Sequence, residues 1–153
     1  MLTVQTKYIG DVTVDQNKII TFPSGLPGFK HETKFILHPL SSIPAEVFQT
    51  LQSVNTPHLA FVVANPYHFY RDYEFRLNEP ARKHLQISHE KDVLVLAIVT
   101  LKSPFEKSTL NLKAPLIINS TLQLGKQLIL TDEDYPMKAP LKQAPPQRAK
   151  GES

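Results

Sequence analysis

Two carboxylates in this sequence have the type and spacing that acid–base chemistry needs. Asp72 and Glu74 alternate along a predicted strand, so both would point to one face, where one could act as an acid and the other as a base. A solvent-exposed strand face explains the same pair, and we favour it over a small enzyme with these residues in a pocket. The sequence contains no Gly-x-Ser-x-Gly elbow, and its spacing ties no nucleophile to a base. We therefore predict a protein that is not an enzyme and has no catalytic residues.

Histidines and acidic residues raise the question of a metal site. The histidines form no His-Glu-x-x-His pair, and there is no cysteine to join them as a ligand. The run Asp132-Glu133-Asp134 lacks the alternating oxygen ligands and central glycine of a calcium loop. We expect no metal, no cofactor and six histidines scattered over the surface: His31, His38, His58, His68, His84 and His89.

An aromatic segment, residues 65–75, is the most distinctive part of the sequence. It reads NPYHFYRDYEF and holds five of the thirteen aromatic residues of the chain, interleaved with proline and charges directly after an apolar run. Tyr73 and Phe75 are candidates to complete the core. The remaining rings cannot all be buried, so some of Tyr67, Phe69 and Tyr70 should be accessible. Accessible tyrosine and phenylalanine rings offer a large contact area for a binding partner.

The segment 23–29, PSGLPGF, is a second candidate surface. Two glycines and two prolines in seven residues predict a fixed, irregular loop, because glycine supplies positive φ and proline fixes φ near −65°. A purely structural role explains this loop equally well.

Short apolar runs separated by turn signals indicate an all-β, mainly antiparallel fold, a small β-barrel-like single domain. The runs 59–64 and 93–100 are apolar at consecutive positions, so both of their faces should be covered. One short helix is expected, because Asn78 can cap it and Pro80 is tolerated in its first turn. The expected strands are a hairpin of 4–6 and 12–14, then 18–22, 35–38, 48–54, 59–64, 93–100, and a last hairpin of 116–119 and 126–130 around Gly125.

The positive charge of the chain is concentrated at its end. The last 17 residues carry four cations and one anion, whereas the preceding part has 13 basic and 13 acidic residues and is neutral. We expect one domain over residues 1–137, and a disordered, basic, proline-rich tail over residues 138–153. A nucleic-acid-binding domain should carry a basic stripe on its folded part, so direct nucleic-acid binding is not expected. An RNA-binding module that uses the tail and stacks bases on the aromatic segment is the alternative.

The apolar runs also bear on location. None approaches the roughly 20 residues of a membrane-spanning helix, and the N-terminal residues lack the basic and apolar regions of a signal peptide. With no cysteine for disulfides, these features suit a cytoplasmic protein that does not associate with membranes.

The chain closely resembles the FliW family of flagellar assembly factors. The resemblance covers residues 1–137 in order, and only the set of segments is specific. The matching segments are 6–11 (TKYIGD), 19–29 (IITFPSGLPGF), 51–54 (LQSV), 59–63 (LAFVV), 65–67 (NPY), 72–75 (DYEF), 93–100 (VLVLAIVT), 111–119 (NLKAPLIIN), 125–127 (GKQ) and 135–136 (YP).

The resemblance implies a cytoplasmic β-barrel-like protein that binds two other proteins. One implied partner is the C-terminal region of flagellin, and the other is the carbon storage regulator CsrA, an RNA-binding repressor of flagellin translation. Free FliW would bind CsrA at a site outside the RNA-binding groove of CsrA, and would therefore inhibit it allosterically. Unsecreted flagellin would occupy FliW and leave CsrA free. Two departures are the neutral body, where the family surface is usually acidic, and the basic tail, which lies outside the shared pattern.

The resemblance does not identify the interface residues. We expect partner binding by the two candidate segments, through Pro23, Leu26, Phe29, Asn65, Pro66, Tyr67, Phe69, Tyr70, Asp72 and Glu74.

Overall fold

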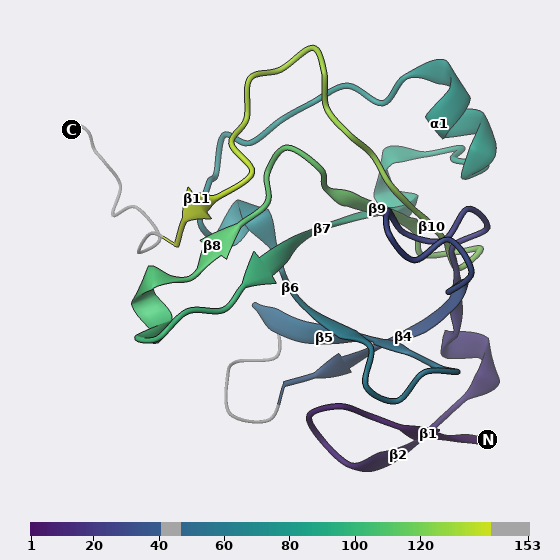
Figure 1. The fold of residues 1–153 in the computed structure, drawn as a ribbon. Helices are drawn as coiled ribbons and strands as arrows, with labels where there is room; N and C mark the ends of the chain where they lie inside the picture. Colours follow the sequence, from purple (N-terminus) through teal and green to yellow (C-terminus); the bar gives the residue numbers. More distant parts are fainter. Residues whose placement is uncertain (41–46, 142–153) are drawn as a thin grey trace.

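The main strands of the protein close into a ring (Figure 1). A computed structural model describes residues 1–40 and 47–141 of the chain. Each strand of the ring pairs with the next, and β7 pairs with both β6 and β9. The predicted mainly antiparallel, barrel-like fold is confirmed. In order around the ring the strands are β3 (Ile20–Thr21), β4 (Lys34–Pro39), β5 (Phe48–Ser53), β6 (Ala60–Ala64), β7 (Val93–Thr100), β9 (Leu116–Asn119) and β10 (Leu124–Gln127).

One parallel contact closes this ring. β10 runs parallel to β3, with Leu124 opposite Thr21, and the Thr21 amide donates to the Gln123 carbonyl oxygen over 2.9 Å. The other pairings between described strands are antiparallel.

The ring separates two apolar cores. Side chains alternate across a strand, so in β6 Val63 points into the barrel while Val62 and Ala64 point outward. β7 alternates in the same way, which confirms that both faces of these two strands are covered. The inner core contains Ile20, Phe22, Leu26, Phe35, Leu51, Val63, Leu96, Leu116 and Ile118.

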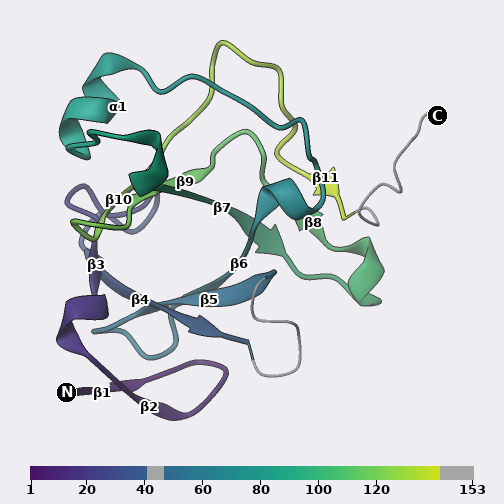
Figure 2. The ribbon, with the colours of Figure 1, turned by 180° about the vertical axis from the view of Figure 1, so that it is seen from behind.

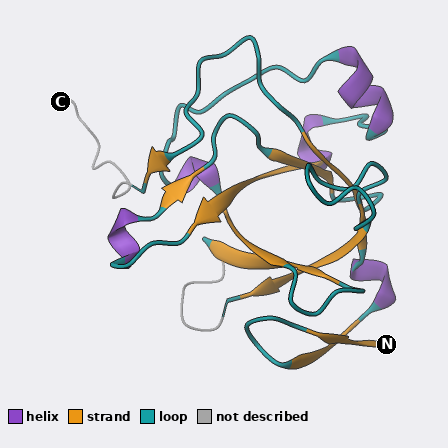
Figure 3. Cartoon of the chain, viewed as in Figure 1, coloured by secondary structure: helices purple, strands orange, loops and turns teal. Residues whose placement is uncertain are grey.

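The outer core is covered by the connection between β6 and β7 and by the C-terminal part of the described chain (Figures 1 and 2). The connection contains α1 (Glu79–His84), and the Asn78 side chain accepts the Ala81 amide over 2.8 Å, as the predicted cap should. β8 (Thr109–Leu110) pairs with the end of β7, and β11 (Ala139–Pro140) pairs with β8. Figure 3 shows how much of this outer layer is loop.

The N-terminal hairpin forms a separate sheet. β1 (Leu2–Gln5) pairs antiparallel with β2 (Asp11–Val14), as predicted. Short 3₁₀ turns occur at Gln16–Lys18, Pro66–His68, Glu90–Asp92 and Phe105–Lys107.

Two strand predictions need correction. Residue 18 belongs to a 3₁₀ turn, so the strand expected over residues 18–22 shortens to β3. The last hairpin does not turn at Gly125, which lies inside β10. A Cβ atom at this position would come within 2.6 Å of the Phe22 ring. The glycine is there because a buried ring packs against the backbone, and not because the chain turns.

The folded chain extends beyond residue 137. Ala139 is buried at 1% exposure, and the Tyr70 hydroxyl donates a hydrogen bond to the Pro140 carbonyl oxygen. Residues 138–141 therefore belong to the described fold. The rest of the predicted tail, residues 142–153, lies outside the described residues.

Candidate binding surface

The loop 23–29 follows β3 and places Leu26 in the inner core. Its backbone turns tightly, because the Phe29 amide donates to the Leu26 carbonyl oxygen over 2.7 Å. Gly25 has φ +66°, and a Cβ atom there would approach the Lys30 carbonyl oxygen to 2.5 Å. Both the positive φ and the lack of room for a Cβ atom therefore require glycine at position 25.

Only part of this loop is accessible. Leu26 is buried at 2% exposure and belongs to the inner core, so its side chain cannot contact a partner. Pro23 is exposed, and Phe29 is 40% exposed, with its ring edge-on to Phe61 at 5.7 Å.

The aromatic segment divides between core and surface. Phe69 is buried and packs against Phe48, so it is not one of the accessible rings expected among Tyr67, Phe69 and Tyr70. Tyr73 is buried as expected. Pro66 is also buried, and Tyr70 is half-buried. Tyr67 is 38% exposed and is the accessible ring of the segment.

Local hydrogen bonds hold Tyr67 in place. The Asn65 side chain accepts the Tyr67 amide over 2.9 Å and caps the 3₁₀ turn Pro66–His68, which starts with a proline. The Tyr67 ring rests against Tyr73, with 5.7 Å between ring centroids. Tyr67 is therefore an exposed ring on a rigid support, which reduces the entropy lost when a partner binds.

The phenols of this segment are neutral hydrogen-bond donors. Burial raises the pKa of Tyr67, and the nearby Tyr135 and Glu74 raise it further. Burial also raises the pKa of Tyr70 and, more strongly, that of Tyr73.

Asp72 and Glu74 do not alternate along a strand. Asp72 lies in a turn and Glu74 in an irregular extended stretch, and both are exposed. Both carboxylates therefore face solvent and do not share a buried pocket. The described residues also contain no group of three or more His, Cys, Asp and Glu side chains placed to hold a metal ion.

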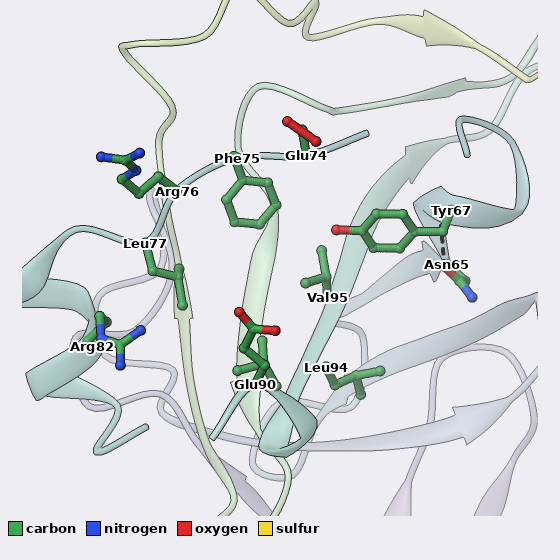
Figure 4. A pocket seen from close by; sticks show the side chains of 11 residues that line it. Asn65, Tyr67, Glu74, Phe75, Arg76, Leu77, Arg82, Glu90, Leu94 and Val95 are labelled. Carbon is green, nitrogen blue, oxygen red and sulfur yellow. Dashed lines mark hydrogen bonds between the residues drawn. The ribbon is translucent and has the colours of Figure 1, made fainter. Parts of the chain in front are cut away.

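A groove lies beside Tyr67 along the first half of β7 (Figure 4). We call it the β7 groove, and its volume is about 610 Å³. Val93 and Val95 of β7 line it, while Tyr67, Phe75 and Leu77 approach from the connection between β6 and β7. Its volume is in the range of ligand sites, and its lining combines apolar with polar side chains.

Charged side chains surround the apolar part of this lining. Arg76 and Arg82 lie at the end nearest α1, opposite Tyr67, and Glu90 projects between Arg82 and β7 (Figure 4). Glu74 is close enough to Tyr67 to raise the pKa of its phenol. Our predictions for the site include Asn65, Tyr67 and Glu74 of this groove. They miss its β7 and α1 side chains, for which the only sequence signal was the apolar run 93–100.

The β7 groove draws on only one of the two candidate segments. The β7 groove is lined by Asn65, Tyr67 and Glu74 of the aromatic segment and by no residue of the loop 23–29. Within residues 1–40 and 47–141, no helix is both long and apolar enough to cross a membrane.

Similar proteins are found by both sequence and structure. The sequence model of the family described as FliW protein matches residues 3–141. The flagellar assembly factor FliW of Oceanobacillus iheyensis is 44% identical over 145 residues, which are 95% of this chain and 97% of that protein. That of Bacillus subtilis (strain 168) is 42% identical over 140 residues, with 92% and 96% covered. A crystal structure of the flagellar assembly factor FliW matches with a TM-score of 0.85 and 41% identity, covering 91% of this chain and 96% of that one.

Proposed function

The chain belongs to the FliW family, whose relatives are named flagellar assembly factors, and on that basis we propose that it regulates flagellin synthesis by binding two proteins in turn. Bound to CsrA, it antagonises this repressor allosterically and allows flagellin translation. Bound to the C-terminal region of flagellin, it releases CsrA. The switch acts in the cytoplasm and couples flagellin synthesis to flagellin export.

The observation that carries this proposal, besides the family, is an exposed aromatic ring on a rigid support. Tyr67 is 38% exposed beside the β7 groove, and its backbone is capped by Asn65. Rigid aromatic side chains next to apolar pockets dominate the binding energy of many protein interfaces. A switch of this kind needs no chemistry, because a free-energy difference of about 1.4 kcal/mol moves the occupancy of two competing partners tenfold.

Calorimetric titration of the purified chain tests the proposal. We expect a stoichiometric complex with CsrA, from which an excess of flagellin displaces the chain. A chain that binds neither protein would refute the proposed function. Binding of both proteins at once, without displacement, would refute the switch but not the two interactions.

Two tyrosine variants test the surface. Tyr67→Ala should weaken at least one of the two complexes by about 2 kcal/mol, or roughly thirtyfold. Tyr8→Ala is the matched control, because Tyr8 is 43% exposed between β1 and β2 and does not line the groove. Equal effects of the two changes would place the interface elsewhere.

Truncation after Leu141 tests the RNA-binding alternative. It removes only residues beyond the described fold and leaves the pair β8–β11 intact. The proposal expects CsrA and flagellin binding to survive. RNA binding that falls steeply with salt and disappears with the tail would support the alternative instead.

A further inference from the structure

β7 loses one of its two neighbours halfway along its length. β6 pairs with it only through Val63 opposite Ile98 and Ala64 opposite Ala97. The chain then leaves the sheet and forms the 3₁₀ turn Pro66–His68. β9 nevertheless pairs with β7 from Val93 to Leu96. The first half of β7 is thus paired along one edge only.

The direction of the free backbone groups follows from the register. Antiparallel neighbours exchange hydrogen bonds at every second residue, and the Ser120 amide donates to the Asp92 carbonyl oxygen over 2.8 Å. Leu94 and Leu96 therefore direct their amides and carbonyls toward β9, whereas Val93 and Val95 direct theirs toward the edge that β6 has left.

Bonds on the other side of β9 agree with this assignment. The Leu128 amide donates to the Pro115 carbonyl oxygen over 2.9 Å, so by the same alternation Ile117 bonds to β10. Ile117 is the residue opposite Val95. It therefore has no backbone bond to offer Val95.

Val95 is left with an amide and a carbonyl that lack partners among the described residues. Val93 differs, because its amide donates to the Glu90 carbonyl oxygen. Both valines line the β7 groove. Val95 is partly buried, so solvent reaches this edge only in part. Free strand edges are the sites where proteins accept an additional strand.

We propose that the β7 groove binds an extended segment of a partner protein, which adds an antiparallel strand to β7 in the position that β6 leaves. One backbone residue of this segment accepts the Val95 amide and donates to the Val95 carbonyl. Its aliphatic side chain packs against Phe75 and Leu77. This inference rests on the proposed function only in taking the partner to be a protein.

The charges around the groove specify the ends of the segment. Arg76 and Arg82 lie nearest α1, whereas Glu74 is on the side of Tyr67. Arg82 already pairs with Glu79 over 3.8 Å and lies near Glu90. An acidic residue of the partner at the α1 end therefore belongs opposite Arg76. Exposed ion pairs contribute only about 0–1 kcal/mol, so they select orientation while the backbone bonds and apolar contacts supply affinity.

Amide hydrogen exchange, measured residue by residue by NMR on the full chain, tests the free edge. The Val95 amide should exchange at least roughly a hundredfold faster than the amides of Leu94 and Leu96, which bond to β9. The probe is the acetylated, amidated peptide Thr-Val-Thr-Val-Glu-Glu at millimolar concentration. It should slow the exchange of Val95 severalfold and leave Leu94 and Leu96 unchanged. A Val95 amide that is already protected, or one that the probe does not slow, overturns the proposal.

Two methylated probes test the mode of binding. One carries methyl groups on the valine nitrogens and the other on the threonine nitrogens. Alternate amides of a strand point to opposite edges, so only one methylated set faces β7. On titration, one peptide should still change the chemical shifts of the protein, and the other should leave them unchanged. Equal retention or equal loss contradicts strand addition.

Side-chain variants complete the test. Tyr67→Ala should weaken binding of the unmodified probe about tenfold, and Tyr8→Ala should change it by less than about twofold. Equal effects would overturn the assignment to the β7 groove. The probe contains neither CsrA nor flagellin, so its failure does not affect the partner titrations, and failure of those titrations does not affect the exchange of Val95.

Discussion

The hydroxyl of Tyr73 donates a hydrogen bond to the carbonyl oxygen of Leu112 over 2.7 Å, although 39 residues separate the two in sequence. The Tyr73 ring also packs edge-on against Tyr135, with 4.7 Å between centroids. Through these two interactions, the connection between β6 and β7, which lines the β7 groove, is held against residues nearer the C-terminus.

We predict that Tyr73→Phe lowers the free energy of unfolding by about 1–3 kcal/mol, because the buried hydrogen bond to the Leu112 carbonyl is lost. Urea unfolding measures the change. The control Tyr8→Phe, at a ring 43% exposed, should stay within about 0.5 kcal/mol of the unmodified chain. Equal stability of the two variants would show that the hydrogen bond contributes nothing.

Asn119 ties the end of α1 to β9 and also caps the turn after β9. Its side-chain amide donates to the Leu85 carbonyl oxygen over 2.8 Å, and its oxygen accepts the amides of Thr121 and Leu122 over 3.1 Å. Asn119→Ala leaves the buried Leu85 carbonyl and the partly buried Thr121 and Leu122 amides without this partner. We therefore expect the free energy of unfolding to fall by about 3 kcal/mol. The exposed Asn17→Ala is the control, and thermal unfolding compares them. A loss below that of Asn17→Ala would contradict this role.

Gly25 and Gly10 form a matched pair for a test of the loop 23–29. Both have positive φ, +66° and +70°, but only Gly25 lacks room for a Cβ atom. Gly10→Ala should therefore cost about 1 kcal/mol of backbone strain. Gly25→Ala should cost about 3 kcal/mol or more, because its methyl group meets the Phe29 and Lys30 carbonyls. Urea titration measures the free energy of unfolding of both variants. Similar losses for Gly10→Ala and Gly25→Ala would refute the steric argument.

Glu32 predicts a pH dependence. Hydrogen bonds from Ser53, and next from Thr56, lower the pKa of its carboxyl group below the ordinary value. A carboxyl group whose pKa is lower in the folded chain stabilises it above the unfolded-state pKa. That contribution is lost as the pH falls through the folded-state pKa.

The variant Glu32→Gln measures this contribution. In urea unfolding from pH 7 down to pH 3, the unmodified chain should lose stability more steeply than Glu32→Gln. The control Glu106→Gln removes an exposed carboxylate and should follow the unmodified chain. Parallel curves for all three proteins would rule out a role of Glu32 in the acid sensitivity.

Features that depend on local sequence were predictable. The apolar run 93–100 coincides with β7, and Asn78 caps α1 as expected, because consecutive apolar residues and a capping side chain act within a few residues. The hairpin of β1 and β2 is of the same kind.

Features that depend on distant contacts were not predictable. The turn expected at Gly125 was wrong because the Phe22 ring, far away in sequence, occupies the space of its side chain. Phe69 looks the same in sequence as Tyr67, and only its packing against Phe48 separates a core ring from a surface ring. The half-free edge of β7 arises from the point at which β6 turns away, which no pattern within 93–100 encodes.

The parallel contact between β3 and β10 also sets the order of events during synthesis. Thr21 emerges from the ribosome about a hundred residues before Leu124, its neighbour in the ring. Until then β3 can pair only with β4, and its other edge stays open. Contacts so distant in sequence slow folding and prolong the exposure of strand edges. The barrel can therefore close only when nearly the whole described chain has been made. Until then, the edge of β3 that pairs with β10 stays unpaired in the nascent protein.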